Sequence, residues 1–172
     1  MKRLILGLAI LFAISGCGGW GGYVHKSDRY DFKFVFPPIW EVWDRSDDRR
    51  DFLVGNLPED YLSEIQVITE PVSPDMSPQE IYLRFLDGGD DAVVYKNFEI
   101  VEQGTISCKN TEGRFTKVTF EKDGELMMGM KAKFLGFKFT VEIKAFVPEE
   151  KWIMHEADFK KMIHIIEIKT IS

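Results

Sequence analysis

Two acidic stretches contain side chains that could bind a hard metal cation. One stretch holds Asp44, Asp47, Asp48 and Asp51, and the other holds Asp87, Asp90 and Asp91 around Gly88 and Gly89. Carboxylate oxygens are the ligands that Ca²⁺ and Mg²⁺ prefer, but neither stretch has the spacing of a known calcium loop. In the first stretch, neighbouring arginines offset the charge of the aspartates. The second stretch would follow a helix, where an acidic turn exposed to solvent is common. The sequence therefore predicts no metal and no cofactor.

Three methionines, Met127, Met128 and Met130, could instead bind Cu(I) through their thioether sulfurs. In a strand, successive side chains point to opposite faces, so Met128 and Met130 would point inward together with Leu126. The alternation favours core packing for these residues over metal binding.

The remaining candidates for catalysis are His155, His164 and Cys108. The histidines are nine residues apart, and at about 100° per residue they would lie on opposite sides of one helix. Cys108 could be a reactive thiol, but a lone strand cysteine is more often a small buried apolar residue. The sequence also has no G-x-S-x-G, phosphate-loop or paired-histidine zinc motif. We therefore expect a protein that is not an enzyme.

The most specific chemical motif surrounds Cys17. Lys2 and Arg3 precede an apolar run over residues 4–14, which is well short of the roughly 20 residues that span a bilayer and is typical of a secretory signal peptide. Ile14-Ser15-Gly16-Cys17 resembles the lipobox of bacterial lipoproteins. The resemblance implies cleavage before Cys17, a diacylglyceryl thioether on its sulfur and an acylated amino group, whose chains would hold the protein at a membrane. The alternative is an ordinary signal followed by a chance cysteine.

We accordingly predict a lipoprotein signal peptide over 1–16, the lipidated cysteine and a glycine-rich tether over 17–28, and one globular domain over 29–172. Removing Lys2 and Arg3 with the signal peptide changes the formal charge from −6 to −8, which disfavours nucleic acid as a partner. With Cys17 lipidated, Cys108 has no cysteine left to pair with. Gly18 stands where an aspartate would retain an enteric lipoprotein in the inner membrane, so the periplasmic face of the outer membrane is favoured.

The mature chain begins with strand patterns. Tyr30, Phe32, Phe34 and Phe36 alternate with mostly polar residues, which predicts a half-buried strand that ends at Pro37-Pro38. Further strands are expected over 41–43, 52–57, 64–69 and 98–102.

A helix is expected from Ser77 to about Asp87. Ser77 is a suitable N-cap, Pro78 suits the first turn, and Glu80 completes a capping box. Gly88-Gly89 would end this helix. Its apolar stripe would consist of Ile81, Tyr82, Phe85 and Leu86.

Residues 114–146 show the clearest strand alternation. The alternating apolar residues are Leu126, Met128, Met130, Ala132 and Phe134, then Phe137, Phe139, Val141, Ile143 and Ala145. Asp123-Gly124 and Gly136 predict hairpin turns between antiparallel strands with one apolar face. A helix beginning near Pro148 would cover that face with Trp152, Phe159, Ile163 and Ile166, and residues 166–171 could be frayed helix or a short strand.

This order of strands, capped helix, meander and final helix describes an α+β sandwich. It resembles the PsbP-like family, which includes extrinsic proteins of the photosynthetic oxygen-evolving complex and DcrB-type bacterial lipoproteins. The residues that carry the resemblance are Tyr30, Phe32, Phe34, Phe36-Pro37, Trp40, Ser77-Pro78-Gln79-Glu80 and Phe159-Lys160-Lys161-Met162-Ile163. The resemblance implies an antiparallel β-sheet packed against helices as an αβα sandwich, and a mostly non-catalytic accessory role at membrane complexes.

The predicted function is therefore that of a lipid-anchored, non-catalytic accessory protein of the cell envelope that binds another envelope protein. A small-ligand or lipid carrier is the alternative, with a hydrolase as a third possibility. A carrier would need an apolar cavity between sheet and helix, whereas the phenylalanines and Trp152 favour a filled interior.

Overall fold

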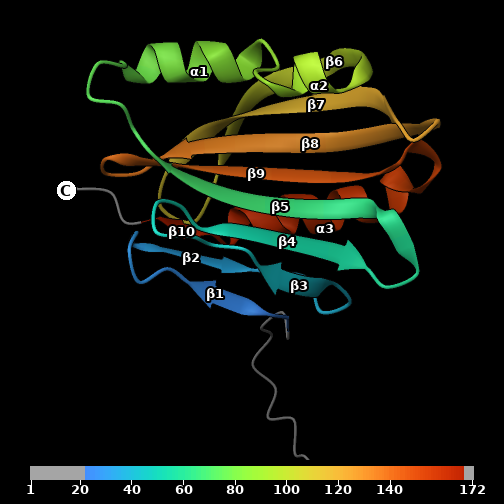
Figure 1. Cartoon of the computed structure of the whole chain (residues 1–172), viewed down its shortest axis with the longest axis horizontal. Helices are drawn as coiled ribbons and strands as arrows, with labels where there is room; N and C mark the ends of the chain where they lie inside the picture. The colour runs from blue at the N-terminus through green and yellow to red at the C-terminus, as the bar shows by residue number, and fades with distance from the viewer. Residues whose placement is uncertain (1–21, 169–172) are drawn as a thin grey trace, which may run out of the picture.

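A seven-stranded antiparallel sheet forms the centre of the computed structural model, which describes residues 22–168 (Figure 1). Its strands, in spatial order, are β3 (Glu41–Asp44), β4 (Phe52–Leu57), β5 (Asp60–Pro71), β9 (Phe139–Pro148), β8 (Glu125–Leu135), β7 (Glu112–Lys122) and β6 (Lys96–Ser107). The predicted strands are confirmed, although β5 and β6 are longer than expected. The predicted signal peptide, Cys17 and residues 18–21 lie outside the described residues. No helix within 22–168 is both long and apolar enough to span a membrane.

A second sheet has three strands in the order β1 (Val24–Lys26), β2 (Phe32–Val35) and β10 (Glu167–Ile168). Residues 167–168 of the final segment form the short strand β10, in which Ile168 pairs with Phe32, and residues 169–171 lie outside the described residues. Strand β1 lies within the range that we expected to be tether, and the structure corrects that expectation. Three residues are too few to show an alternating pattern, so only the pairing with β2 reveals this strand.

The first helix, α1 (Pro78–Leu86), begins and ends as the sequence predicts. The Ser77 hydroxyl accepts a hydrogen bond from the Glu80 backbone N–H at 3.3 Å, and the Glu80 carboxylate accepts one from the Ser77 backbone N–H at 2.7 Å. Both halves of the capping box are therefore present. The chain then leaves the helix through Gly88 and Gly89, which adopt positive φ values of 90° and 57°.

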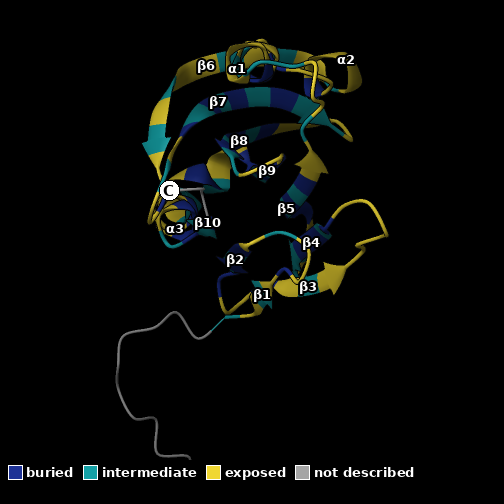
Figure 2. Ribbon diagram, turned by 90° about the vertical axis from the view of Figure 1, so that its left-hand side faces the viewer, coloured by how far each residue is buried: buried dark blue, intermediate teal, exposed yellow. Residues whose placement is uncertain are grey.

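The main core lies between the large sheet and the opposite helix, α3 (Trp152–His164), which follows a 3₁₀ turn η1 (Glu149–Lys151). The predicted residues Trp152, Phe159, Ile163 and Ile166 are all buried there. Figure 2 shows the sheet curving, with α3 and the small sheet on one side and α1 with the short helix α2 (Asp91–Val94) elsewhere on its surface. This arrangement is the predicted α+β sandwich.

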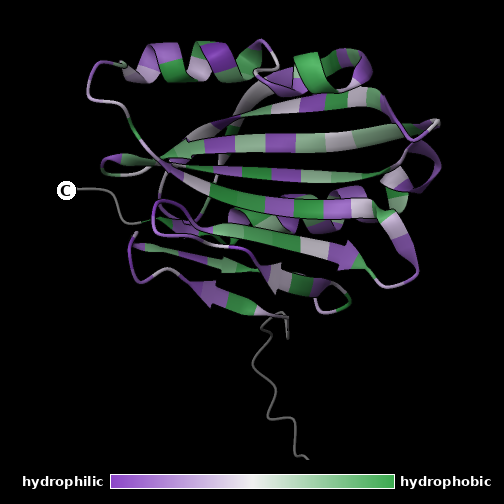
Figure 3. Ribbon diagram, viewed as in Figure 1, coloured by the Kyte–Doolittle hydropathy of each residue, from purple (hydrophilic) through white to green (hydrophobic). Residues whose placement is uncertain are grey.

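The strands β8 and β9 carry buried residues on both faces, whereas the alternation in the sequence predicted one buried face. A second core cluster on the side of α2 contains Leu62, Val118, Phe120, Met127 and Phe146. Met127 is fully buried in this cluster, whereas Leu126, expected in the core, is 47% exposed. Phe137 was also expected to point inward but lies in the turn before β9 and is 51% exposed. Figure 3 shows hydrophobic and hydrophilic residues alternating along the strands of the large sheet.

Candidate functional site

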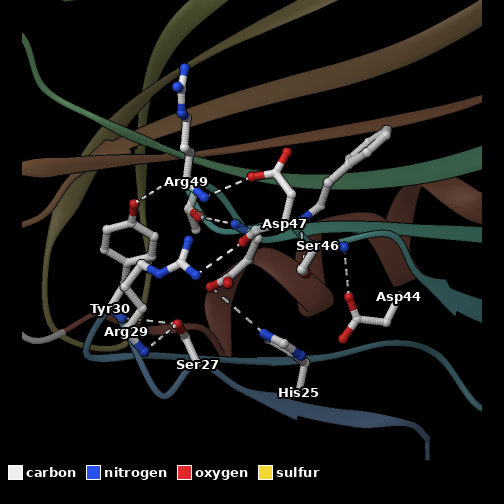
Figure 4. A network of polar contacts seen from close by, with 11 residues as sticks. His25, Ser27, Arg29, Tyr30, Asp44, Ser46, Asp47 and Arg49 are labelled. Atoms are coloured by element: carbon white, nitrogen blue, oxygen red, sulfur yellow. Dashed lines mark hydrogen bonds and ion pairs between the residues drawn. The ribbon is translucent and has the colours of Figure 1, made fainter.

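The aspartates at positions 44–51 lie around the loop between β3 and β4, and the loop uses two of them to hold its own backbone. Asp44 accepts a hydrogen bond from the Ser46 backbone N–H at 2.9 Å, and Asp47 accepts bonds from the backbone N–H groups of Arg49 and Arg50 at 2.7 and 3.0 Å (Figure 4). The bonds from Arg49 and Arg50 lower the pKa of Asp47. Among residues 22–168, no three His, Cys, Asp or Glu side chains are arranged to hold a metal ion.

The same loop fastens the small sheet to the large one. The Tyr30 hydroxyl donates to the Arg49 carbonyl at 2.7 Å, and the Arg29 guanidinium donates to the Asp47 carbonyl at 3.0 Å (Figure 4). On β1, His25 Nε2 lies 3.8 Å from Asp51 Oδ2 at the start of β4. His25 could not be recognised from the sequence, because one histidine in a three-residue strand gives no pattern. We interpret this network as a structural link between the two sheets.

The second acidic stretch divides into exposed and buried members. Asp87 and Asp90 are exposed, as expected for a surface turn, but Asp91 is only 6% exposed, which corrects the expectation for this residue. Its carboxylate lies between two lysines of the large sheet, with Lys131 Nζ at 2.5 Å from Oδ2 and Lys144 Nζ at 2.8 Å from Oδ1. These lysines are directly opposite each other on β8 and β9.

These ion pairs shift the pKa values of Asp91 and Lys144. Burial raises the pKa of Asp91, but the charges of Lys144 and Lys131 outweigh burial and leave it below its ordinary value. Burial lowers the pKa of Lys144, but Glu142 and Asp91 outweigh burial and leave it above its ordinary value. Lys131 also donates to the Gly88 carbonyl at 3.0 Å, and Lys133 lies 2.6 Å from Glu142.

A groove of about 370 Å³ borders the network, between α1 and the sheet. Its lining includes the three lysines Lys131, Lys133 and Lys144, and each of them is ion-paired to Asp91 or Glu142. We interpret these ion pairs as structural contacts that hold the segment containing α1 and α2 against the sheet.

The sulfur and imidazole candidates lie apart. Met128 and Met130 belong to the main core, as predicted, whereas Met127 faces the second cluster on the other side of β8. The His155 ring stacks on Phe159, with 6.0 Å between ring centroids.

His164 Nδ1 lies 2.7 Å from the Ser107 carbonyl. Cys108 is 7% exposed and packs in the main core, in agreement with its interpretation as a small buried apolar residue.

Exposed apolar side chains that were not expected from the sequence occur on β3, just after the β4–β5 turn and at the start of α3. We call these side chains the turn surface, which consists of Trp43 on β3, Tyr61 after the β4–β5 turn, and Ile153 and Met154 in the first turn of α3. Their exposed fractions are 44%, 78%, 83% and 64%. Lys151 joins the two segments through an ion pair with Asp60, at 2.6 Å between Nζ and Oδ2.

A groove of about 440 Å³ opens at the turn surface, on the outer face of β3, β4 and β5. Trp43, Pro58 and Tyr61 contribute to its wall, together with the charged side chains of Glu41 and Arg45. Aromatic side chains beside a polar rim are typical of protein interfaces. The turn surface is therefore the best candidate for a binding site.

Comparisons with known proteins identify the fold. No protein-family model matches the sequence, and no curated protein matches it. The structure is similar to cyanobacterial PsbP (CyanoP) from Synechocystis sp. PCC 6803, with a TM-score of 0.67 and 12% identity over 91% of this chain and 99% of that chain.

Two further solved structures have the same architecture. LpqN, involved in cell envelope biogenesis of Mycobacterium tuberculosis, gives a TM-score of 0.58 at 14% identity, covering 87% of each chain. The Ran-binding protein Mog1p of Saccharomyces cerevisiae gives a TM-score of 0.56 at 11% identity, covering 88% of this chain and 97% of that chain. At these identities the similarity establishes the fold alone, and the chain has a PsbP-like α+β fold.

Proposed function

We propose that this protein is a lipid-anchored accessory protein of the cell envelope, held at the periplasmic face of the outer membrane through Cys17, that binds another envelope protein through the turn surface. The observation that carries the proposal is the exposure of Trp43 and Tyr61 on a groove at the outer face of β3–β5, together with the exposure of Ile153 and Met154 at the start of α3. Exposed aromatic side chains beside a groove with charged residues at its rim are typical of a protein interface.

The geometry of the turn surface suits a protein partner. The Lys151–Asp60 ion pair holds the β4–β5 turn against the start of α3, so the apolar groups are presented from fixed positions. The bond from Lys151 and the one from the Ser63 hydroxyl outweigh burial and lower the pKa of Asp60, so the pair stays charged at neutral pH. Because Glu41 and Arg45 border the groove with opposite charges, we expect the partner to present an apolar segment flanked by polar groups.

The carrier alternative has less support. The space between the large sheet and α3 is filled by side chains such as Phe134, Phe159 and Met162, each with 0% exposure. The two grooves described above are open and have charged linings, whereas lipid carriers need an enclosed apolar cavity. Protein binding also agrees with two of the similar solved structures, an envelope-biogenesis protein and a Ran-binding protein.

Site-specific photocrosslinking in the native membrane tests the docking proposal. A photoreactive residue at Tyr61 or Ile153 is expected to give one adduct of reproducible mass, because these side chains would lie in the interface. Val93, which is 88% exposed on α2, is the matched control and is expected to give none. The same adduct mass from positions 61 and 93, or no adduct at 61 and 153 in several growth states, would contradict the proposal.

The anchor is tested separately, since it depends on Cys17 alone. Cys17→Ser removes the sulfur that the lipid transfer needs, so labelling with a radioactive fatty acid should be lost while the rest of the chain is unchanged. Equal label in the variant and the parent would exclude lipidation at this cysteine.

A further inference from the structure

The described chain begins at the bottom end of the molecule, beside strands β1 and β3, in both Figure 1 and Figure 2. Residues 22–24 run along the chain segment 35–37, with the Phe36 backbone N–H donating to the Tyr23 carbonyl at 2.9 Å. A Cβ added at Gly22 would lie 1.7 Å from the Phe36 carbonyl oxygen, so the backbone is pressed against this segment. The attachment point of the tether is therefore fixed on the surface of the domain.

The length of chain between Cys17 and this point limits which surface can reach a membrane. Tyr23 follows Cys17 by six positions, a distance of at most about 20 Å when the chain is fully extended. A domain of this length is roughly 40 Å across. Since the tether is shorter than the domain is wide, a lipid on Cys17 would keep the end of the domain around Gly22 next to the bilayer and the opposite end in water.

That end carries apolar groups of the kinds found at membrane surfaces. Tyr23 is 44% exposed, Val24 is 52% exposed, and Ile39, in the Pro37–Trp40 turn, is 60% exposed. Tyrosine rings sit well at the level of lipid headgroups because they have an apolar body and a polar tip. Pro38 precedes Ile39 and is also exposed, so the turn presents a second short apolar edge.

We propose that Tyr23, Val24 and Ile39 form a membrane seat that rests in the headgroup layer and fixes the orientation of the anchored domain. This inference rests on the lipid anchor proposed above. Three partly exposed side chains on an acidic domain would not bind a bilayer from solution, because they bury little apolar area and anionic lipids repel the net charge. A short tether supplies an effective concentration in the millimolar range, at which such a weak contact becomes populated.

Spin labelling of the lipidated full-length protein in vesicles of phosphatidylethanolamine and phosphatidylglycerol tests the seat. A nitroxide is attached at Ile39→Cys, with Val24→Cys as a second position in the seat. The control is Val93→Cys on α2, which lies at the opposite end of the molecule in both views. The parent chain serves as the labelling blank, because Cys108 is buried and the Cys17 sulfur would be in a thioether.

The readout is the ratio of nitroxide collision rates with oxygen, which concentrates in membranes, and with a water-soluble nickel chelate. We expect a ratio several-fold higher at positions 39 and 24 than at position 93. Flotation of the vesicles is measured on the same samples. A chain that floats but has equal ratios at the three positions overturns the seat and leaves the anchor intact. A chain that does not float overturns the anchor, and the seat with it.

Discussion

Replacing Asp91 by asparagine removes the carboxylate that separates two lysines of the large sheet. Lys131, which is 2% exposed, would then face Lys144 directly across β8 and β9. Removing one partner of a buried ion pair costs about 3–5 kcal/mol, because the remaining charge stays desolvated. Both lysines retain Glu142, at 4.0 Å from Lys131 and 3.6 Å from Lys144, so we expect a loss at the low end of this range, about 3 kcal/mol. For a domain of this size that corresponds to a fall in Tm of roughly 6–12 °C.

Urea unfolding, followed by tryptophan fluorescence on a soluble form that starts at Gly18, measures this loss. Glu167→Gln is the matched control, because the Lys109–Glu167 pair is exposed and should contribute at most about 1 kcal/mol. Combining Asp91→Asn with Lys131→Met should cost less than the sum of the single changes, since the second change removes the stranded charge. A loss below about 0.5 kcal/mol for Asp91→Asn, or simple additivity, would refute the role of the network.

The pH dependence of stability gives an independent check on Asp91. Its pKa is lowered in the folded state, so its contribution is fully present above the pKa of the unfolded chain, which is about 3.9, and is lost as pH falls through the lower folded value. The pKa of Lys144 is raised, so its contribution is complete below about 10.4 and is lost at higher pH. Asp91→Asn should therefore flatten the acid limb of the stability profile below pH ~4.

Two further predictions concern local structure. Ser77→Ala removes one half of the capping box and should cost about 1 kcal/mol, and an unchanged urea midpoint would contradict the assigned helix start. Gly129→Ala would place a Cβ 2.1 Å from a ring carbon of Phe146 and should cost about 1–3 kcal/mol in urea unfolding. Gly124 is the control, because no atom lies within 4 Å of the added Cβ. Gly124→Ala should cost only about 1 kcal/mol, because the positive φ at this position disfavours alanine. Equal losses of unfolding free energy for the two variants would exclude the steric explanation.

The sequence was sufficient where local interactions decide the structure. The capping box of Ser77 and Glu80 satisfies donors within one turn of helix, and it needs no distant partner to be recognised. Phe32 and Phe34 alternate with less buried residues, which likewise indicates that one face of strand β2 is buried. These patterns predicted the order of elements and the α+β fold.

Features that depend on distant partners could not be predicted in this way. Lys131 looks like the polar member of an alternating strand, and only the folding of α2 onto the sheet brings Asp91 beside it. Met127 is buried because Phe120 and Phe146 of neighbouring strands cover the second face. An isolated apolar residue such as Tyr61 gives no signal of exposure, because its surroundings come from another part of the chain.

Strand β2 lies between the first and last strands of the described chain, since β1 and β10 pair with its two edges. A ribosome delivers β1 and β2 early, but β2 cannot complete its sheet until residues 167–168 have emerged, so the core beneath Phe32 closes late. A polypeptide that delays closure in this way stays extensible during its synthesis, which is the state that the export proposed above would require.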